Sequence, residues 1–170
     1  MKKFAVIGDP IEHSQSPDLH NWVFQQQKVN AEYVKLRIAT GAAEEFLAGM
    51  RGGAFDGINV TLPLKELVAA RMDFLEAQAV RLQAVNCVHR QHGKLTGYNT
   101  DIIGFGNTLA AFNVRVAGQV CILLGAGGVA RSVLAALLEQ NPARIIIVNR
   151  TSERARRLSR WGSGLDPAIE

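Results

Sequence analysis

The stretch that decides the fold runs from Val120 to Ala130 and reads VCILLGAGGVA. Its first five residues, Val120–Leu124, form an apolar run that predicts a strand, and apolar side chains recur at the helical period across residues 129–139. Between the two segments, Gly125, Gly127 and Ala130 match the pattern G-x-G-x-x-G/A. The order of strand, glycine turn and helix indicates a dinucleotide-binding α/β unit.

The residues of this turn suit a pyrophosphate group. Gly125 permits a tight turn, Gly127 lets the backbone approach the phosphates, and Ala130 keeps the helix close to the sheet. The helix N-terminus adds N–H donors and a partial positive charge. We expect the cofactor to bind along the whole turn, formed by Gly125, Ala126, Gly127, Gly128, Val129 and Ala130. The alternative is a glycine-rich turn that binds nothing.

The residues after the next predicted strand, at 144–148, indicate which dinucleotide binds. Recognition of the ribose 2′-hydroxyl of NAD needs a carboxylate about twenty residues after the glycine turn. This chain has Asn149, Arg150 and Thr151 at that place, and Arg154 follows one helical turn later. Because a guanidinium pairs with a 2′-phosphate in bidentate fashion, we predict NADP. The alternative is an exposed basic helix face, which is our expectation for Arg156, Arg157 and Arg160.

Strand-like and helical segments also alternate upstream of this unit. We predict strands at 4–8, 32–38 and 57–62, a hairpin at 85–90 and 94–98, and helices at 18–27, 42–50, 64–72, 75–82 and 102–112. The pattern predicts an α/β fold in which a mostly parallel sheet forms a substrate domain over residues 1–113.

The segment 114–170 adds strands at 120–124 and 144–148 and helices at 129–139 and 152–160. This is an incomplete Rossmann-like NADP-binding domain, since such domains use about six strands. We expect one sheet edge and apolar strand surface to lie uncovered.

Composition excludes several classes of partner. The net charge is +4, but the arginines crowd the end of the chain and lack the interleaved aromatic residues of a nucleic-acid-binding face. No apolar run is long enough for a membrane span, and no targeting segment is visible. Cys87 and Cys121 lie in apolar runs without metal-ligand spacing, and His89 and His92 lack a third ligand, so we expect reduced thiols, no metal site and a cytoplasmic protein.

Small polar groups stand at the predicted turns and strand ends of the first domain. They fall in the segments Ser14-Gln15-Ser16-Pro17, Asn59-Val60-Thr61-Leu62-Pro63-Leu64-Lys65, Ala84-Val85-Asn86 and Asn99-Thr100-Asp101. Hydroxyls, amides, one amine and one carboxylate are what a polyhydroxylated acid needs.

Each of these groups also has a structural interpretation. Ser16 before Pro17 could cap a helix, and Asp101 could cap the helix at 102–112. Lys65 could be a solvated surface residue, whereas Asn59, Thr61 and Asn86 could bond the local backbone.

In combination, these motifs resemble the shikimate dehydrogenase family from Phe4 to about Leu158. The segments that carry the resemblance read GDPIEHSQSP, NVTLPLK, AVN, GYNTD and GAGGVA followed by NRT. The chain is thereby identified as a C-terminally truncated member. The resemblance implies the reversible NADPH-dependent reduction of 3-dehydroshikimate to shikimate, in chorismate and aromatic amino-acid biosynthesis.

The resemblance also implies roles for particular residues. Lys65 and Asp101 correspond to the catalytic pair, with Lys65 donating the proton and Asp101 orienting it. The implied substrate-binding set is Ser14, Ser16, Asn59, Thr61, Lys65, Asn86 and Asp101. The partners are then small molecules, and a homodimer is compatible with the family.

Two other functions stay open at this point. One is a non-catalytic remnant that binds shikimate or a nucleotide without turnover. The other is a related NADP enzyme such as a methylenetetrahydrofolate dehydrogenase, against which the serine pair and the Asn99-Thr100-Asp101 turn argue.

Overall fold

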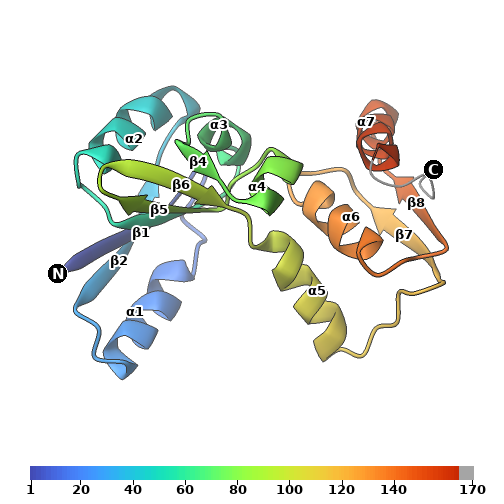
Figure 1. Ribbon diagram of the computed structural model, residues 1–170, viewed down its shortest axis with the longest axis horizontal. Helices are drawn as coiled ribbons and strands as arrows, with labels where there is room; N and C mark the ends of the chain where they lie inside the picture. Colours follow the sequence, from blue (N-terminus) through green and yellow to red (C-terminus); the bar gives the residue numbers. More distant parts are fainter. Residues whose placement is uncertain (165–170) are drawn as a thin grey trace. The chain divides into compact units, whose positions relative to one another are not determined.

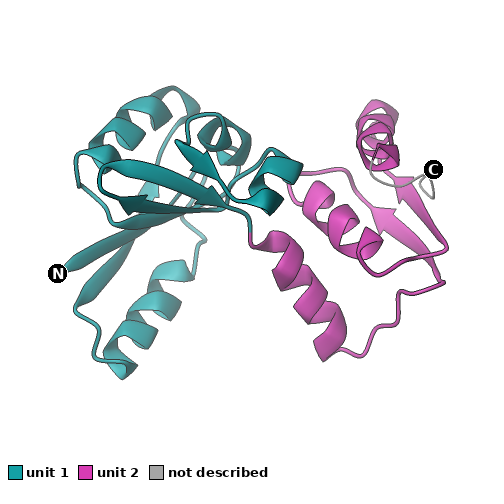
Figure 2. Ribbon diagram, in the orientation of Figure 1, with its two compact units in different colours: residues 1–99 teal, residues 100–170 magenta. Residues whose placement is uncertain are grey.

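The computed structural model describes residues 1–164 and divides the chain into two compact units. Unit 1 comprises Met1–Asn99 and unit 2 comprises Thr100–Glu170 (Figure 2). The sheet and core of each unit are built from its own strands and helices.

Unit 1 contains a six-stranded mixed sheet in the order β2-β1-β3-β5-β6-β4. β1 pairs in parallel with β2 and β3, β4 pairs in parallel with β6, and β5 is antiparallel to β3 and β6. The strands are β1 (Lys2–Gly8), β2 (Ala31–Arg37), β3 (Gly57–Val60), β4 (Phe74–Leu75), β5 (Cys87–Gln91) and β6 (Lys94–Tyr98). The predicted parallel core and hairpin are confirmed, whereas β4 was missed because we assigned Leu75 to a helix.

Helices cover both faces of this sheet, and in Figure 1 α1 and α2 lie on opposite sides of β1 and β2. The helical elements are α1 (Ser16–Gln26), the 3₁₀ turn η1 (Thr40–Ala42), α2 (Ala43–Arg51), α3 (Lys65–Ala69) and α4 (Ala77–Leu82). Because strand side chains alternate between faces, Ala5 and Ile7 of β1 join the main core, whereas Val6 packs with Tyr33 in a second cluster. The second cluster includes Phe24 of α1.

Two glycines of unit 1 allow close packing. A Cβ atom on Gly97 would lie 2.6 Å from Cγ2 of Val85 and 2.8 Å from Cγ of Met72. A Cβ atom on Gly8, at the end of β1, would lie 2.5 Å from Cγ2 of Thr61. The absence of a side chain at Gly8 therefore gives Thr61 its place beside the end of β1.

Unit 2, as far as residue 164, contains two parallel strands and three helices. These are α5 (Asp101–Ala111), β7 (Val120–Leu124), α6 (Ala130–Leu138), β8 (Arg144–Val148) and α7 (Ser152–Ser163). Leu134, Ile145 and Leu158 form the centre of its core. We expected the first domain to extend to residue 113, but α5 groups with unit 2 because Phe105 and Leu109 pack on this core.

One face of the two-stranded sheet is apolar and exposed. Val120, Ile122 and Leu124 alternate along β7 toward solvent, and 78% of Leu124 is accessible. The uncovered apolar strand surface expected from the sequence is thus confirmed. Within residues 1–164, no helix has the length and apolar character needed to cross a membrane.

Candidate active site

The sheet of unit 1 gathers the predicted substrate-binding residues at one edge. Parallel strands β1 and β3 end at the same edge, so the loop that carries Ser14 and Ser16 lies beside the segment that carries Thr61 and Lys65. Asn86 comes just before β5, which runs antiparallel to β3 and therefore starts at this edge.

A pocket of about 300 Å³ opens between these loops. Ser14, Ser16 and Thr61 line it together with His13, and Val6, Pro10 and Ile11 supply its apolar wall. The Oγ atom of Ser14 accepts a hydrogen bond from the backbone N–H of Ser16 at 3.3 Å. The two serines thus face a common cavity with the threonine, as a hydroxylated ligand requires.

The structure does not support the helix-capping interpretation of Ser16. Ser16 is the first residue of α1, Gln15 occupies the N-cap position, and the cap has no side-chain hydrogen bond. The Ser16 side chain instead lines the pocket of about 300 Å³.

Side chains of β2 hold the serine loop in place. Nζ of Lys35 donates to the carbonyl oxygens of Glu12 at 2.9 Å and Ser14 at 3.5 Å. Nε of Arg37 donates to Oδ1 of Asp9 at 2.7 Å. Because these contacts reach both ends of the loop, β2 fixes the backbone from which Ser14 projects.

Asn59 lies on β3 and is held by two hydrogen bonds. Its Oδ1 accepts from the Tyr33 hydroxyl at 2.7 Å, and its Nδ2 donates to the carbonyl of Asn86 at 3.2 Å. Burial raises the pKa of Tyr33 well above its usual range, so the phenol stays protonated and remains a donor. Asn59 thus bonds a backbone carbonyl 27 residues along the chain and not its local backbone.

Tyr33 was not among the residues predicted from the sequence. The alternation predicted at 32–38 places Tyr33, Lys35 and Arg37 on one face of the strand, which was the available signal. Tyr33 and Asn59 also line a second, mainly apolar pocket of about 340 Å³ with His20, Cys87 and His89. Burial raises the pKa of the Cys87 thiol, which disfavours the thiolate.

Lys65 is the first residue of α3. Its carbonyl accepts a hydrogen bond from the backbone N–H of Val85 at 3.0 Å, which ties α3 to the segment that carries Asn86.

Asn99 is buried at the end of β6 and donates from Nδ2 to the carbonyl of Ala84 at 2.9 Å. Asp101 is the first residue of α5 in unit 2, where a carboxylate is favourable to the helix dipole.

The glycine turn of unit 2 joins β7 to α6. Gly125 has φ +107°, a conformation that L side chains rarely adopt, and its N–H donates to the carbonyl of Val148 at 2.8 Å. The backbone N–H of Ala126 donates to Oδ1 of Asn149 at 3.1 Å. Nδ2 of Asn149 donates in turn to the carbonyl of Thr151 at 2.8 Å. The two predicted cofactor segments are thus joined by one side chain.

The turn fits a pyrophosphate group. A Cβ atom on Gly127 would meet no heavy atom of the described residues within 4 Å, so the space in front of the backbone is open to a ligand. Ala130 is buried in the unit 2 core, which brings α6 close to the sheet. The N-cap of α6, at Val129, has no side-chain hydrogen bond that would compete with a phosphate.

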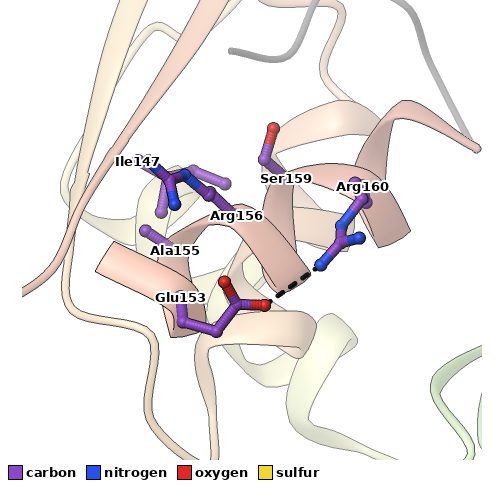
Figure 3. Close-up of a pocket in the computed structure, with 6 residues that line it drawn as sticks. All are labelled: Ile147, Glu153, Ala155, Arg156, Ser159 and Arg160. Carbon is purple, nitrogen blue, oxygen red and sulfur yellow. Dashed lines mark hydrogen bonds and ion pairs between the residues drawn. The ribbon is translucent and has the colours of Figure 1, made fainter. Parts of the chain in front are cut away.

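Residues Arg150, Thr151 and Arg154 are exposed after β8, where a 2′-phosphate is expected. A separate pocket of about 540 Å³ lies along α7 and is shown in Figure 3. It is lined by Ile147, Glu153, Ala155, Arg156, Ser159 and Arg160. None of these is a predicted site residue, and an ion pair of 3.2 Å between Glu153 and Arg160 offsets part of its positive charge.

Family models match both units. The model described as "Shikimate dehydrogenase substrate binding domain" matches residues 6–88, and the model described as "Shikimate / quinate 5-dehydrogenase" matches residues 107–164. The chain belongs to the shikimate dehydrogenase family. Within this family, the first model covers the 300 Å³ pocket and the second covers the glycine turn.

Individual shikimate dehydrogenases align along nearly the whole chain. The NADP(+) enzyme of Carboxydothermus hydrogenoformans is 40% identical over 169 residues, which are 99% of this chain and 60% of that protein. The corresponding protein of Caldanaerobacter subterraneus subsp. tengcongensis is 37% identical over 160 residues, 94% of this chain and 57% of that protein. The chain therefore spans about 60% of the length of these relatives.

A solved structure shares the fold. Shikimate 5-dehydrogenase from Thermus thermophilus, in complex with NADP(H) and shikimate, superposes with a TM-score of 0.88 and 37% identity. The match covers 96% of this chain and 61% of that chain. The expected fold class, a substrate domain followed by a Rossmann-like unit, is confirmed.

Proposed function

We propose that this chain acts in the reversible NADPH-dependent reduction of 3-dehydroshikimate to shikimate. The observation that carries the proposal is the pocket that gathers Ser14, Ser16 and Thr61 at the sheet edge where Lys65 and Asn86 also lie. The glycine turn of unit 2 supplies the second requirement, a place for a dinucleotide. The chain contributes about 60% of the length of the relatives on which the proposal draws.

We propose Lys65 and Asp101 as the catalytic pair. Reduction of a ring ketone requires a hydride at the carbonyl carbon and a proton at the carbonyl oxygen, and bound NADPH supplies the hydride. In this proposal the Lys65 ammonium donates the proton to the developing alkoxide. The Asp101 carboxylate orients Lys65 and accepts a hydrogen bond from a substrate hydroxyl.

The remaining polar residues would fix the ring of the substrate. Hydroxyl and amide groups of Ser14, Ser16, Asn59, Thr61 and Asn86 can bind its hydroxyls and carboxylate, which aligns the carbonyl with the catalytic pair. An analogue that lacks one hydroxyl would leave a polar group of the site unpaired, so the same residues provide specificity.

We propose NADP as the cofactor of unit 2. The turn from Gly125 to Ala130 would hold the pyrophosphate, and Asn149 and Thr151 would complete the cofactor-binding set. The guanidinium groups of Arg150 and Arg154 would bind the 2′-phosphate, which their exposure after β8 permits. We therefore propose that residues 1–113 bind the substrate and residues 114–170 bind the cofactor, with α5 packed on the core of unit 2.

The proposed setting is cytoplasmic, with small molecules rather than nucleic acid or membranes as partners. Free thiols at Cys87 and Cys121 support a reducing compartment. A homodimer is the assembly we propose, supported by the exposed apolar face of β7, since such faces mark association surfaces.

A second candidate is a binding protein without turnover. The pocket lined by Ser14, Ser16 and Thr61 and the open space at Gly127 would be sufficient for ligand binding alone. Such a protein would bind shikimate or NADP through the same pocket or turn, and its ligand affinity would not depend on a proton donor.

The deciding experiment mixes the purified chain with shikimate and NADP⁺ and follows NADPH absorbance. We expect turnover that Lys65→Ala abolishes and Lys2→Ala, a change of an exposed lysine on β1, leaves intact. Calorimetric binding of shikimate without NADPH formation under any condition would identify the second candidate. The absence of both binding and turnover would refute both functions.

A further inference from the structure

Two hydrogen bonds link a residue outside the proposed set to two of the proposed substrate-binding residues. The Tyr33 phenol donates to Oδ1 of Asn59 at 2.7 Å. Nδ2 of Asn59 then donates to the carbonyl of Asn86 at 3.2 Å. These hydrogen bonds therefore join β2, β3 and the segment before β5.

Tyr33 is rigid enough to act as a fixed point. Only 3% of its surface is exposed, and its ring stacks on His20 of α1 with centroids 4.3 Å apart and an interplanar angle of 6°. Its backbone N–H and carbonyl are both bonded to the side-chain amide of Asn21, at 2.9 and 2.8 Å. Both the ring and the backbone of Tyr33 are thus held by α1.

The bond to Tyr33 determines how the Asn59 amide is oriented. An amide can rotate by half a turn and exchange its oxygen and nitrogen, but a phenol that donates to one side and a carbonyl that accepts on the other permit one orientation. Asn59 then has one remaining acceptor lone pair and one remaining N–H for a ligand. Neighbouring hydrogen bonds in such a chain also strengthen one another.

We infer that Tyr33 is a positioning residue for substrate binding, which orients Asn59 without contacting the reacting atoms. The inference rests on the proposed function, because it takes shikimate as the ligand of Asn59. Without the phenol, the Asn59 amide could rotate, so a ligand would have to order it at the expense of affinity.

The test is Tyr33→Phe, which keeps the ring and its stacking on His20 but removes the hydroxyl. In the ligand-free protein, we expect the side-chain amide resonances of Asn59 in a ¹H–¹⁵N spectrum to move. In calorimetry, we expect the Kd for shikimate to rise about ten-fold, the loss of about one hydrogen bond, with the Kd for NADP⁺ unchanged. Tyr98→Phe removes the same atom from the other tyrosine and serves as the matched control.

A double-mutant cycle separates positioning from a general structural role. If Tyr33 acts through Asn59, Tyr33→Phe has little further effect on shikimate affinity in an Asn59→Ala background. Additive losses, or an unchanged Kd in a folded Tyr33→Phe protein, would overturn the inference. A wild-type chain that binds no shikimate refutes the proposed substrate and this inference together, whereas wild-type binding with an unaffected variant refutes the role of Tyr33 alone.

Discussion

Gly127→Ala should separate cofactor binding from folding. A Cβ atom at this position meets no heavy atom of the described residues within 4 Å, and Gly127 is not among the residues with positive φ. The substitution therefore introduces no clash or strained backbone, and the loss of glycine entropy in the unfolded chain favours stability by about 0.4–1 kcal/mol.

The effect on the cofactor follows from the same open space. The added methyl group would occupy the position through which a pyrophosphate approaches the turn. Loss of a single charge-assisted hydrogen bond costs about 1.5–3 kcal/mol, so the Kd for NADP⁺ should rise at least about ten-fold.

The assay combines calorimetry with NADP⁺ and thermal unfolding. Gly125→Ala is the contrasting variant, because its φ of +107° forces strain of about 1–3 kcal/mol and should lower the Tm. A folded Gly127→Ala protein that binds NADP⁺ as tightly as the wild type would show that the turn does not hold the pyrophosphate.

Three further outcomes are expected. Gly97→Ala overpacks the main core and should lower stability by about 1–3 kcal/mol in denaturant titrations, whereas Gly106→Ala, in open space on α5, should not. Lys35→Met removes the ammonium that holds the serine loop, and calorimetry should show weaker shikimate binding with an unchanged Tm. A hydrogen bond from the backbone N–H of Leu95 holds the pKa of Asp73 below its usual value, so its stabilising contribution is present above about pH 4 and lost as pH falls through the folded-state pKa. Asp73→Asn should flatten that part of the stability profile; an unchanged profile would contradict the assignment.

Local pattern was sufficient to predict most elements of the fold. The bounds of β7 and β8 match the predicted strands because each is a short apolar run ended by turn residues. Gly125 was singled out for a tight turn and adopts the positive φ that such a turn requires. Ser14, Ser16 and Thr61, which the motifs singled out, line one cavity, and their role in substrate binding stays a prediction.

Features that depend on tertiary contacts were not visible in the sequence. β4 has only two residues and exists because it pairs with β6, so no periodicity marks it. α5 follows the hairpin directly in the chain, but Phe105 and Leu109 assign it to the core of unit 2. The positioning role of Tyr33 depends on a hydrogen bond from its phenol on β2, across β1, to Asn59 on β3. This contact exists because the sheet has the strand order β2-β1-β3.

The amide of Asn149 spans the two loops of unit 2, accepting from Ala126 on one side and donating to Thr151 on the other. We therefore expect the motions of the two loops to be correlated, so that rigidifying one loop should reduce the motion of the other. A fragment of NADP that carries only the adenosine 2′-phosphate half would bind at the loop after β8. We expect it to slow amide hydrogen exchange around Ala126, which lies in the other loop.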